Sequence, residues 1–177
     1  SSSFYAGPYL NPYAFSKWQG EEVCKMFSEV YGLSTANARF FNVFGPGQPS
    51  EGAYATIVGI FERQYKAGKR LTITGDGTQR RDFTHVNDIV SGLIRMSEKH
   101  WSGEIFNLGT GENYSINELA AMYPCDTKYI AKRPGEAKET LADISFASKE
   151  LGYAPSLDLK GYVEDWIEKV DIVKITG

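Results

Sequence analysis

A helix that leads directly into a strand is the feature that most restricts what this chain can fold into. Pro12 is tolerated in the first turn of a helix, the helical pattern covers 13–31, and Gly32 ends it. The segment 33–41 then alternates loosely between apolar and polar residues, which predicts a strand. This step is typical of a parallel α/β sheet, and the turn-rich segment 42–49 leaves the strand's carboxyl end, where open sheets bind ligands.

The same alternation continues along the rest of the chain. The apolar spacing predicts strands over 71–74, 83–86, 104–108 and 128–131, and helices over 54–67, 115–123, 145–151 and 157–170. Asn87 or Asp88 is expected to cap a further helix that ends near Met96. Ser115 and Glu118 have the spacing of a capping box.

Composition excludes several classes of protein. With 177 residues, 42% of them hydrophobic and 23% charged, the chain is expected to form a soluble globular domain. A net charge of −3 argues against general nucleic-acid binding. Cys24 and Cys125 have no CxxC or histidine-rich surroundings, so we expect neither a metal site nor a disulfide, and a cytoplasmic location. No apolar run reaches membrane-spanning length, and the first residues lack a signal-peptide pattern.

The strongest chemical candidate is the pair Tyr13 and Lys17 at the start of the first predicted helix. Residues four apart share one helix face, and a nearby ammonium favours the ionised form of a phenol. Tyr13 is therefore a candidate acid/base, although a bare Tyr-x-x-x-Lys also occurs where the tyrosine only packs against a core. Glu21 and its acidic neighbours on this helix are expected to be solvated or paired with one another.

Other constellations are weaker or incomplete. Gly109 and Gly111 lie between a strand and a helix, but the third glycine and the later acidic residue of a dinucleotide fingerprint are missing, which favours an ordinary turn. The two histidines and the scattered carboxylates indicate neither a hydrolase triad nor a glycosidase pair. Two arginines on predicted loops suit a diphosphate. The separated polar candidates at loop positions are Asn42, Arg81, Arg133 and Glu136.

Six ordered motifs resemble the extended short-chain dehydrogenase/reductases, in particular the NAD-dependent nucleotide-sugar epimerase/dehydratase family typified by UDP-glucose 4-epimerase. They are the serine run 1–3, PYAFSK at 12–17, ARFFNVFGPGQ at 38–48, LTITGDGTQRRDF at 71–83, FNLGTG at 106–111, and RPGE at 133–136 followed by AD at 142–143.

The resemblance implies specific roles. Tyr13 would act as the base toward a sugar hydroxyl, Lys17 would hold the nicotinamide ribose of NAD, and Phe40 would lie at the nicotinamide. Ser2, or Ser1 by a different count, would orient the sugar oxygen. The remaining roles concern the nucleotide-diphosphate sugar, most simply a UDP-sugar: Asn42, Arg81 and Arg133 for its diphosphate, backbone groups of Thr72 and Thr74 for its base, and Glu136 for its ribose. None of these roles requires a metal.

The resemblance also implies an architecture. The fold class is α/β: the C-terminal part of a Rossmann-type parallel sheet plus a small α/β substrate-binding domain. Residues 1–48 would be the remnant of the NAD-binding domain, and 49–177 mainly the substrate domain, with some segments returning to the Rossmann part. The glycine-rich loop that binds the NAD pyrophosphate in this family normally precedes the serine run by roughly one hundred residues. The chain therefore resembles a truncated form, and NAD affinity of this part alone is expected to be poor.

Three functions remain open at this stage. The first is NAD-dependent 4-epimerisation of a UDP-sugar by transient oxidation at the sugar 4-position. The others are a non-catalytic nucleotide-sugar-binding or assembly module, and an NAD(P)-dependent 4-keto-sugar reductase. Dehydration is disfavoured because the serine run lacks the Thr-Asp-Glu acids of dehydratases. The first helix is expected to take part in a homodimer.

Overall fold

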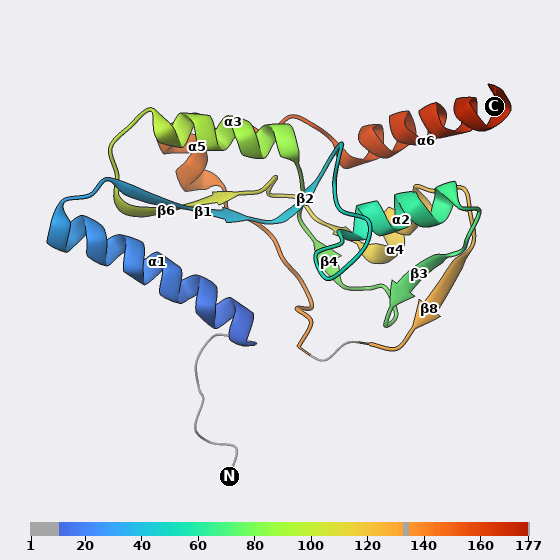
Figure 1. The fold of residues 1–177 in the computed structure, drawn as a ribbon, viewed down its shortest axis with the longest axis horizontal. Coiled ribbons are helices and arrows are strands. Elements are labelled where there is room, and N and C mark those ends of the chain that lie inside the picture. Colours follow the sequence, from blue (N-terminus) through green and yellow to red (C-terminus); the bar gives the residue numbers. More distant parts are fainter. Residues whose placement is uncertain (1–10, 133–134, 177) are drawn as a thin grey trace, which may run out of the picture.

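The computed structural model describes residues 11–132 and 135–176, and Figure 1 shows how they are arranged. In chain order the elements are α1 (Pro12–Tyr31), β1 (Thr35–Phe40), β2 (Asn42–Phe44), α2 (Ile57–Lys66), β3 (Leu71–Thr74), β4 (Arg80–Arg81), β5 (Phe83–His85), α3 (Val86–Ser97), β6 (Ser102–Leu108), β7 (Tyr114–Ser115), α4 (Ile116–Ala121), β8 (Thr127–Ile130), α5 (Ser145–Leu151) and α6 (Leu159–Thr176).

Parallel strand pairs form the framework, which confirms the predicted α/β class. β1 pairs with β6, β2 with β5 and β3 with β8, all in parallel, whereas the short strands β4 and β7 pair antiparallel. α1 lies on one side of the β1–β6 pair, and α3 and α5 lie on the other (Figure 1). Residues 102–108, far along the chain, thus lie beside the first predicted strand. The proposed division of the chain at residue 48 stays a prediction.

The part of the chain that the structure describes has two hydrophobic cores, one toward each end of the molecule. One is built around Phe106 and Leu108 of β6, which pack with Leu151 and Tyr153. The other gathers apolar residues of α2, β3, α4 and α6, and its most buried members are Phe61, Leu71, Leu119 and Val163. Each core is large enough to fix the elements around it, since burying one such side chain stabilises the fold by about 1.5–3 kcal/mol.

β1 confirms the strand predicted over 33–41, but the turn-rich segment predicted over 42–49 is wrong at its start, because Asn42–Phe44 form the strand β2 and Asn42 is therefore not on a loop. β1 ends at Phe40 and follows β6, and β2 begins at Asn42 and follows β5. The backbone N–H of Asn42 donates to the carbonyl of Asp82 (2.9 Å). This bond joins β2 to a different partner strand, which alternation within one segment does not reveal.

Capping side chains explain where the helices begin. Thr56, with its Oγ1 accepting from the N–H of Gly59 (3.0 Å), starts α2 later than predicted. His85, not Asn87 or Asp88, caps α3: its Nδ1 accepts from the Asn87 N–H (3.1 Å). The capping box of α4 is confirmed, with both reciprocal bonds between Ser115 and Glu118.

The acidic face of α1 is not wholly solvated as predicted. Glu21 accepts two hydrogen bonds from the guanidinium of Arg39 on β1, at 2.7 and 2.6 Å, and its side chain is only 13% exposed. No residue of α1 is fully buried. This bidentate ion pair is therefore a specific contact between α1 and the sheet, and it lies one turn beyond Lys17.

Candidate active site

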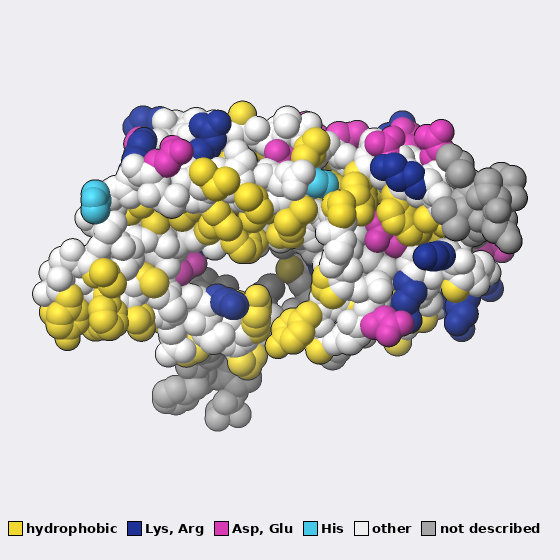
Figure 2. All heavy atoms as spheres, turned by 45° about the horizontal axis from the view of Figure 1, so that its top comes forward, with side chains coloured by type: hydrophobic (Ala, Val, Ile, Leu, Met, Phe, Trp, Pro, Cys, Tyr) yellow, Lys and Arg dark blue, Asp and Glu magenta, His cyan; other side chains and the backbone are white. Residues whose placement is uncertain are grey.

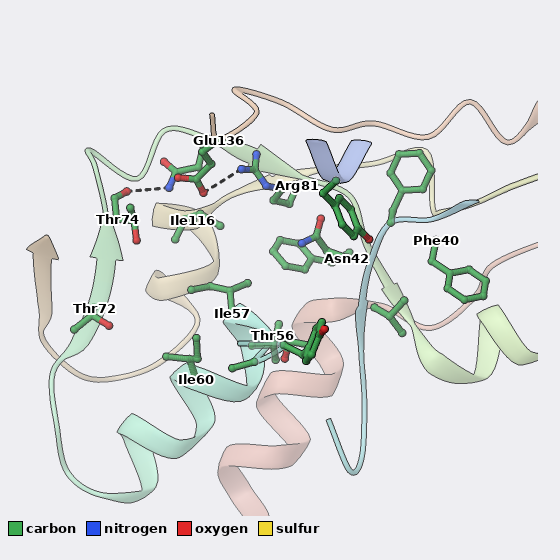
Figure 3. A pocket seen from close by; sticks show the side chains of 18 of the residues that line it. Phe40, Asn42, Thr56, Ile57, Ile60, Thr72, Thr74, Arg81, Ile116 and Glu136 are labelled. Carbon is green, nitrogen blue, oxygen red and sulfur yellow. Dashed lines mark hydrogen bonds and ion pairs between the residues drawn. The ribbon is translucent and has the colours of Figure 1, made fainter. Parts of the chain in front are cut away.

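One cavity of about 590 Å³ gathers most of the residues predicted for the site. It lies between the start of α1, the end of β1, the start of β2, the start of α2 and the edge of β3, and Figure 3 shows its lining. Figure 2 shows hydrophobic side chains around a hollow near the middle of the molecule. The predicted residues that line the cavity are Tyr13, Phe40, Asn42, Thr72, Thr74, Arg81 and Glu136. Ser2 and Arg133 lie outside the described residues.

The start of α1 brings Tyr13 to the cavity. The Asn11 side chain accepts from the N–H of Ala14 (2.9 Å), and Pro12 occupies the first helical turn, so the helix begins just before Tyr13. The Lys17 ammonium lies 5.3 Å from the centre of the Tyr13 ring, as the spacing of four predicts. The Tyr13 side chain is 69% exposed, which leaves its hydroxyl accessible to a substrate.

A buried arginine and a carboxylate form a second part of the cavity wall. Arg81 is on the short strand β4, not on a loop as predicted, and only 11% of its side chain is exposed. Its guanidinium donates to the carbonyl of Arg80 (2.8 Å) and contacts the Glu136 carboxylate at 3.2 Å (Figure 3). Arg81 therefore presents a fixed positive charge to the cavity.

The start of α2 contributes residues that the sequence analysis did not identify. Thr56 lines the cavity, caps α2, and donates through its Oγ1 to the side-chain oxygen of Gln48 (2.8 Å). Gly59 packs against this turn so closely that a Cβ would lie 2.7 Å from the carbonyl oxygen of Pro49. A threonine directly before an apolar helical segment was the available signal for this cap.

Backbone groups of β3 form the far wall, together with apolar side chains. Thr72 and Thr74 line the cavity, as does Gln79, for which the sequence predicted no role. The Gln79 side chain donates to the Thr74 carbonyl (2.9 Å). The isoleucines that line the cavity are Ile57, Ile60, Ile116 and Ile130.

A buried carboxylate behind the site accounts for the Gly109–Gly111 turn. Asp82 is fully buried, and its oxygens accept from the N–H groups of Thr110 (2.9 Å), Gly111 (3.0 Å) and Ala142 (3.1 Å). The N–H groups of residues 110 and 111, which a dinucleotide phosphate would need, are therefore engaged by Asp82. This supports the prediction of an ordinary turn over the dinucleotide alternative.

His85 lies behind the cavity wall, and its surroundings make it sensitive to pH. Its ring meets Phe44 and Tyr162 edge-on, at centroid distances of 5.3 and 5.7 Å. Burial lowers the pKa of His85, and the charge of Asp88 opposes this shift only in part. The neutral ring is the form that can accept the helix-capping hydrogen bond at Nδ1.

Within the described ranges, no group of three or more His, Cys, Asp and Glu side chains is arranged to hold a metal ion. No helix in the same part of the chain is both long and apolar enough to cross a bilayer.

Comparisons with known proteins give consistent results. Residues 2–109 match the NAD dependent epimerase/dehydratase family. A putative UDP-glucose 4-epimerase of Methanocaldococcus jannaschii is 35% identical over 157 residues, which cover 85% of this chain and 50% of that protein. The chain thus spans about half the length of the curated relatives that it matches.

Solved structures show the same Rossmann-type fold. The crystal structure of UDP-glucose 4-epimerase from Thermotoga maritima with UDP-glucose has a TM-score of 0.84 and 30% identity, and covers 92% of this chain and 54% of that one. UDP-glucuronic acid 4-epimerase from Bacillus cereus, in complex with UDP-glucuronic acid and NAD, has a TM-score of 0.82 and 32% identity, covering 98% and 56%. The predicted Rossmann-type fold class is confirmed.

Proposed function

Because the chain belongs to the NAD-dependent epimerase/dehydratase family, we propose that it carries the acid/base pair and the nucleotide-sugar site of a UDP-sugar 4-epimerase. The observation that carries this proposal is the single cavity that Tyr13, Arg81, Glu136 and the edge of β3 all line; in Figure 3, Phe40 lies on one side of it, Arg81 between, and Glu136, Thr72 and Thr74 on the other. A nucleotide-diphosphate sugar has the matching order of parts: a sugar, two phosphates, a ribose and a base.

In the proposed mechanism, Tyr13 removes the proton from the sugar 4-hydroxyl and later returns it. The Lys17 ammonium lies 5.3 Å from the centre of the Tyr13 ring, and we propose that it holds the nicotinamide ribose beside this base. NAD, when bound beside Tyr13, Lys17 and Phe40, would supply the hydride acceptor and donor that this reaction needs. Tyr13, Lys17 and Phe40 are the residues proposed to lie at NAD, and exposed Tyr13 and Phe40 side chains on the cavity wall fit a cofactor that packs there. Ser2 is proposed to orient the sugar oxygen.

The other end of the cavity is proposed to hold the nucleotide. Asn42, Arg81 and Arg133 would bind the diphosphate, and Glu136 would bind the ribose. Arg81 suits this role because its planar guanidinium is already held by backbone and carboxylate contacts, so little side-chain entropy is lost on binding.

The activity is proposed for a protein of the relatives' full length. Within it, residues 1–48 are proposed to belong to the NAD-binding domain and 49–177 mainly to the substrate domain. We further propose a cytoplasmic homodimer in which α1 packs against its copy, because Val23, Phe27 and Val30 of this helix are exposed. Sedimentation at increasing concentration checks the dimer, and a monomer at all concentrations contradicts it.

Turnover of a Tyr13→Phe variant tests the function. A full-length protein with NAD should interconvert UDP-glucose and UDP-galactose, and the variant should lose about 10²–10⁴-fold in kcat because the base is gone. Tyr31→Phe is the matched control, since Tyr31 is on the same helix and is equally exposed (69%). Full activity in the Tyr13→Phe variant would refute the role of Tyr13.

A nucleotide-sugar-binding module without redox chemistry is the second candidate. This candidate is favoured because the chain contains every residue proposed to bind the nucleotide. By contrast, the only residues proposed to contact NAD are Tyr13, Lys17 and Phe40. Calorimetry separates the two: binding of a UDP-sugar without binding of NAD favours the module, and stoichiometric binding of NAD rejects it. The names of the relatives favour epimerisation over 4-keto-sugar reduction.

A further inference from the structure

The strand β3 presents one unpaired edge to the cavity. On its other edge it pairs with β8, through bonds such as Leu71 N–H to the Asp126 carbonyl and Gly75 N–H to the Ile130 carbonyl, both 2.9 Å. In a parallel ladder the residues between these, Thr72 and Thr74, direct their backbone groups to the opposite edge. No strand of the described chain pairs with that edge, and both threonines line the cavity.

Two glutamine side chains occupy the ends of this edge. Gln64 of α2 accepts from the Thr72 N–H (3.0 Å) and donates to the Thr72 hydroxyl (2.8 Å). Gln79 donates to the Thr74 carbonyl (2.9 Å). Along this edge, the first donor is the Thr72 N–H and the last acceptor is the Thr74 carbonyl, and both already have a side-chain partner. What remains is the Thr72 carbonyl next to the Thr74 N–H, and neither has a hydrogen-bond partner in residues 11–132 or 135–176.

One acceptor beside one donor matches the edge of a ring that carries an imide or a cis-amide. In a uracil, N3–H can donate to the Thr72 carbonyl while the neighbouring ring carbonyl accepts from the Thr74 N–H. Ile60 and Ile130 line the same end of the cavity and offer apolar surface to the faces of such a ring. A flat heterocycle is held in this way by its polar edge and by its apolar faces.

We propose that Gln64 and Gln79 are positioning residues for the nucleobase, which act by leaving only the Thr72 carbonyl and the Thr74 N–H available on the β3 edge. The base can then bind in one register only. This inference rests on the proposed function, because it takes the ligand to be a uridine diphosphate, and it adds two residues that touch the strand and not the reacting atoms.

Binding of three ligands to the purified chain tests the inference by calorimetry. UDP has the complete base, 3-methyl-UDP has a methyl group in place of N3–H, and inorganic pyrophosphate has no base. The wild type should bind UDP about tenfold more tightly than 3-methyl-UDP, since one hydrogen bond is lost and the Thr72 carbonyl is left unpaired.

The variants Gln64→Met and Gln79→Met keep the side-chain length but remove the amide. Each should weaken UDP binding about fivefold to tenfold and reduce the preference over 3-methyl-UDP, because the edge is no longer held in one register. Pyrophosphate affinity should stay within about twofold, since the diphosphate contacts are unchanged. Gln19→Met, at an exposed position of α1, is the control and should change none of these affinities.

The outcomes separate the inference from the function on which it rests. Equal loss of UDP and pyrophosphate binding in the variants indicates a merely structural role and overturns the inference, as does a wild type that binds UDP and 3-methyl-UDP equally. A wild type that binds none of the ligands overturns the proposed substrate site as well. Selective UDP binding that depends on both glutamines, in a full-length protein without epimerase activity, supports the inference and removes only the proposed function.

Discussion

Replacing Asp82 by asparagine tests whether one buried carboxylate holds the site segments together. Its Oδ1 accepts from the Thr84 hydroxyl (3.2 Å) and from the N–H and hydroxyl of Thr110 (2.9 and 2.8 Å). Its Oδ2 accepts from the N–H groups of Gly111 (3.0 Å) and Ala142 (3.1 Å). Asp82 also directly follows Arg81, so these bonds fix the backbone beside the cavity.

The size of the effect follows from these bonds. An amide has a single acceptor oxygen, so at least the two donors on one side must face an NH₂ group instead. Each lost hydrogen bond to a charged acceptor costs about 1.5–3 kcal/mol. The variant should therefore lose about 3–6 kcal/mol in its free energy of unfolding, which corresponds to a fall in Tm of roughly 6–24 °C for a chain of this size.

Urea unfolding and calorimetry of the variant and wild type measure this difference. Thr84→Val removes only one of the donors, whose bond of 3.2 Å is the longest of the five, and should cost about 1.5 kcal/mol. Asp165→Asn changes an exposed carboxylate on α6 and should alter the free energy of unfolding by less than about 0.5 kcal/mol. An Asp82→Asn protein that unfolds at the wild-type midpoint would refute the view that this carboxylate ties the segments together.

Two further substitutions test contacts around the site. Burial lowers the pKa of His85 in the folded state. The contribution of neutral His85 to the free energy of unfolding is therefore present above about pH 6.5 and is lost as pH falls through this lower pKa. At that point Nδ1 becomes protonated and can no longer accept the capping hydrogen bond of α3. His85→Asn keeps a capping side chain that does not titrate, so its urea midpoint should fall less than that of the wild type between about pH 7.5 and pH 5; parallel curves would contradict this. Glu21→Gln should lower the free energy of unfolding by about 1 kcal/mol because it weakens the bidentate contact with Arg39, whereas the exposed Glu22→Gln should not. Equal unfolding free energies in the two glutamine variants would show that the ion pair does not anchor α1.

Local patterns were sufficient for much of the fold. Strand 71–74 and helix 145–151 were predicted with the bounds observed, because Gly75 and Gly152 directly follow their last residues. The spacing of Tyr13 and Lys17 also determined their proximity, since both lie on one turn of one helix. The capping box of α4 is local in the same way, because its partners are three residues apart.

Contacts between distant segments could not be read from the chain. Three contacts join positions separated by at least seventeen residues, and no local pattern encodes them. They are the change of strand partner from β6 to β5 after Phe40, the ion pair of Glu21 with Arg39, and the hydrogen bonds from residues 110, 111 and 142 to Asp82. The amino-acid sequence is enough to identify the residue types available for acid/base and diphosphate chemistry. That Tyr13, Arg81, Glu136 and the β3 edge line one cavity follows from the three-dimensional fold, because strand pairing brings elements that are distant in the chain to the same place.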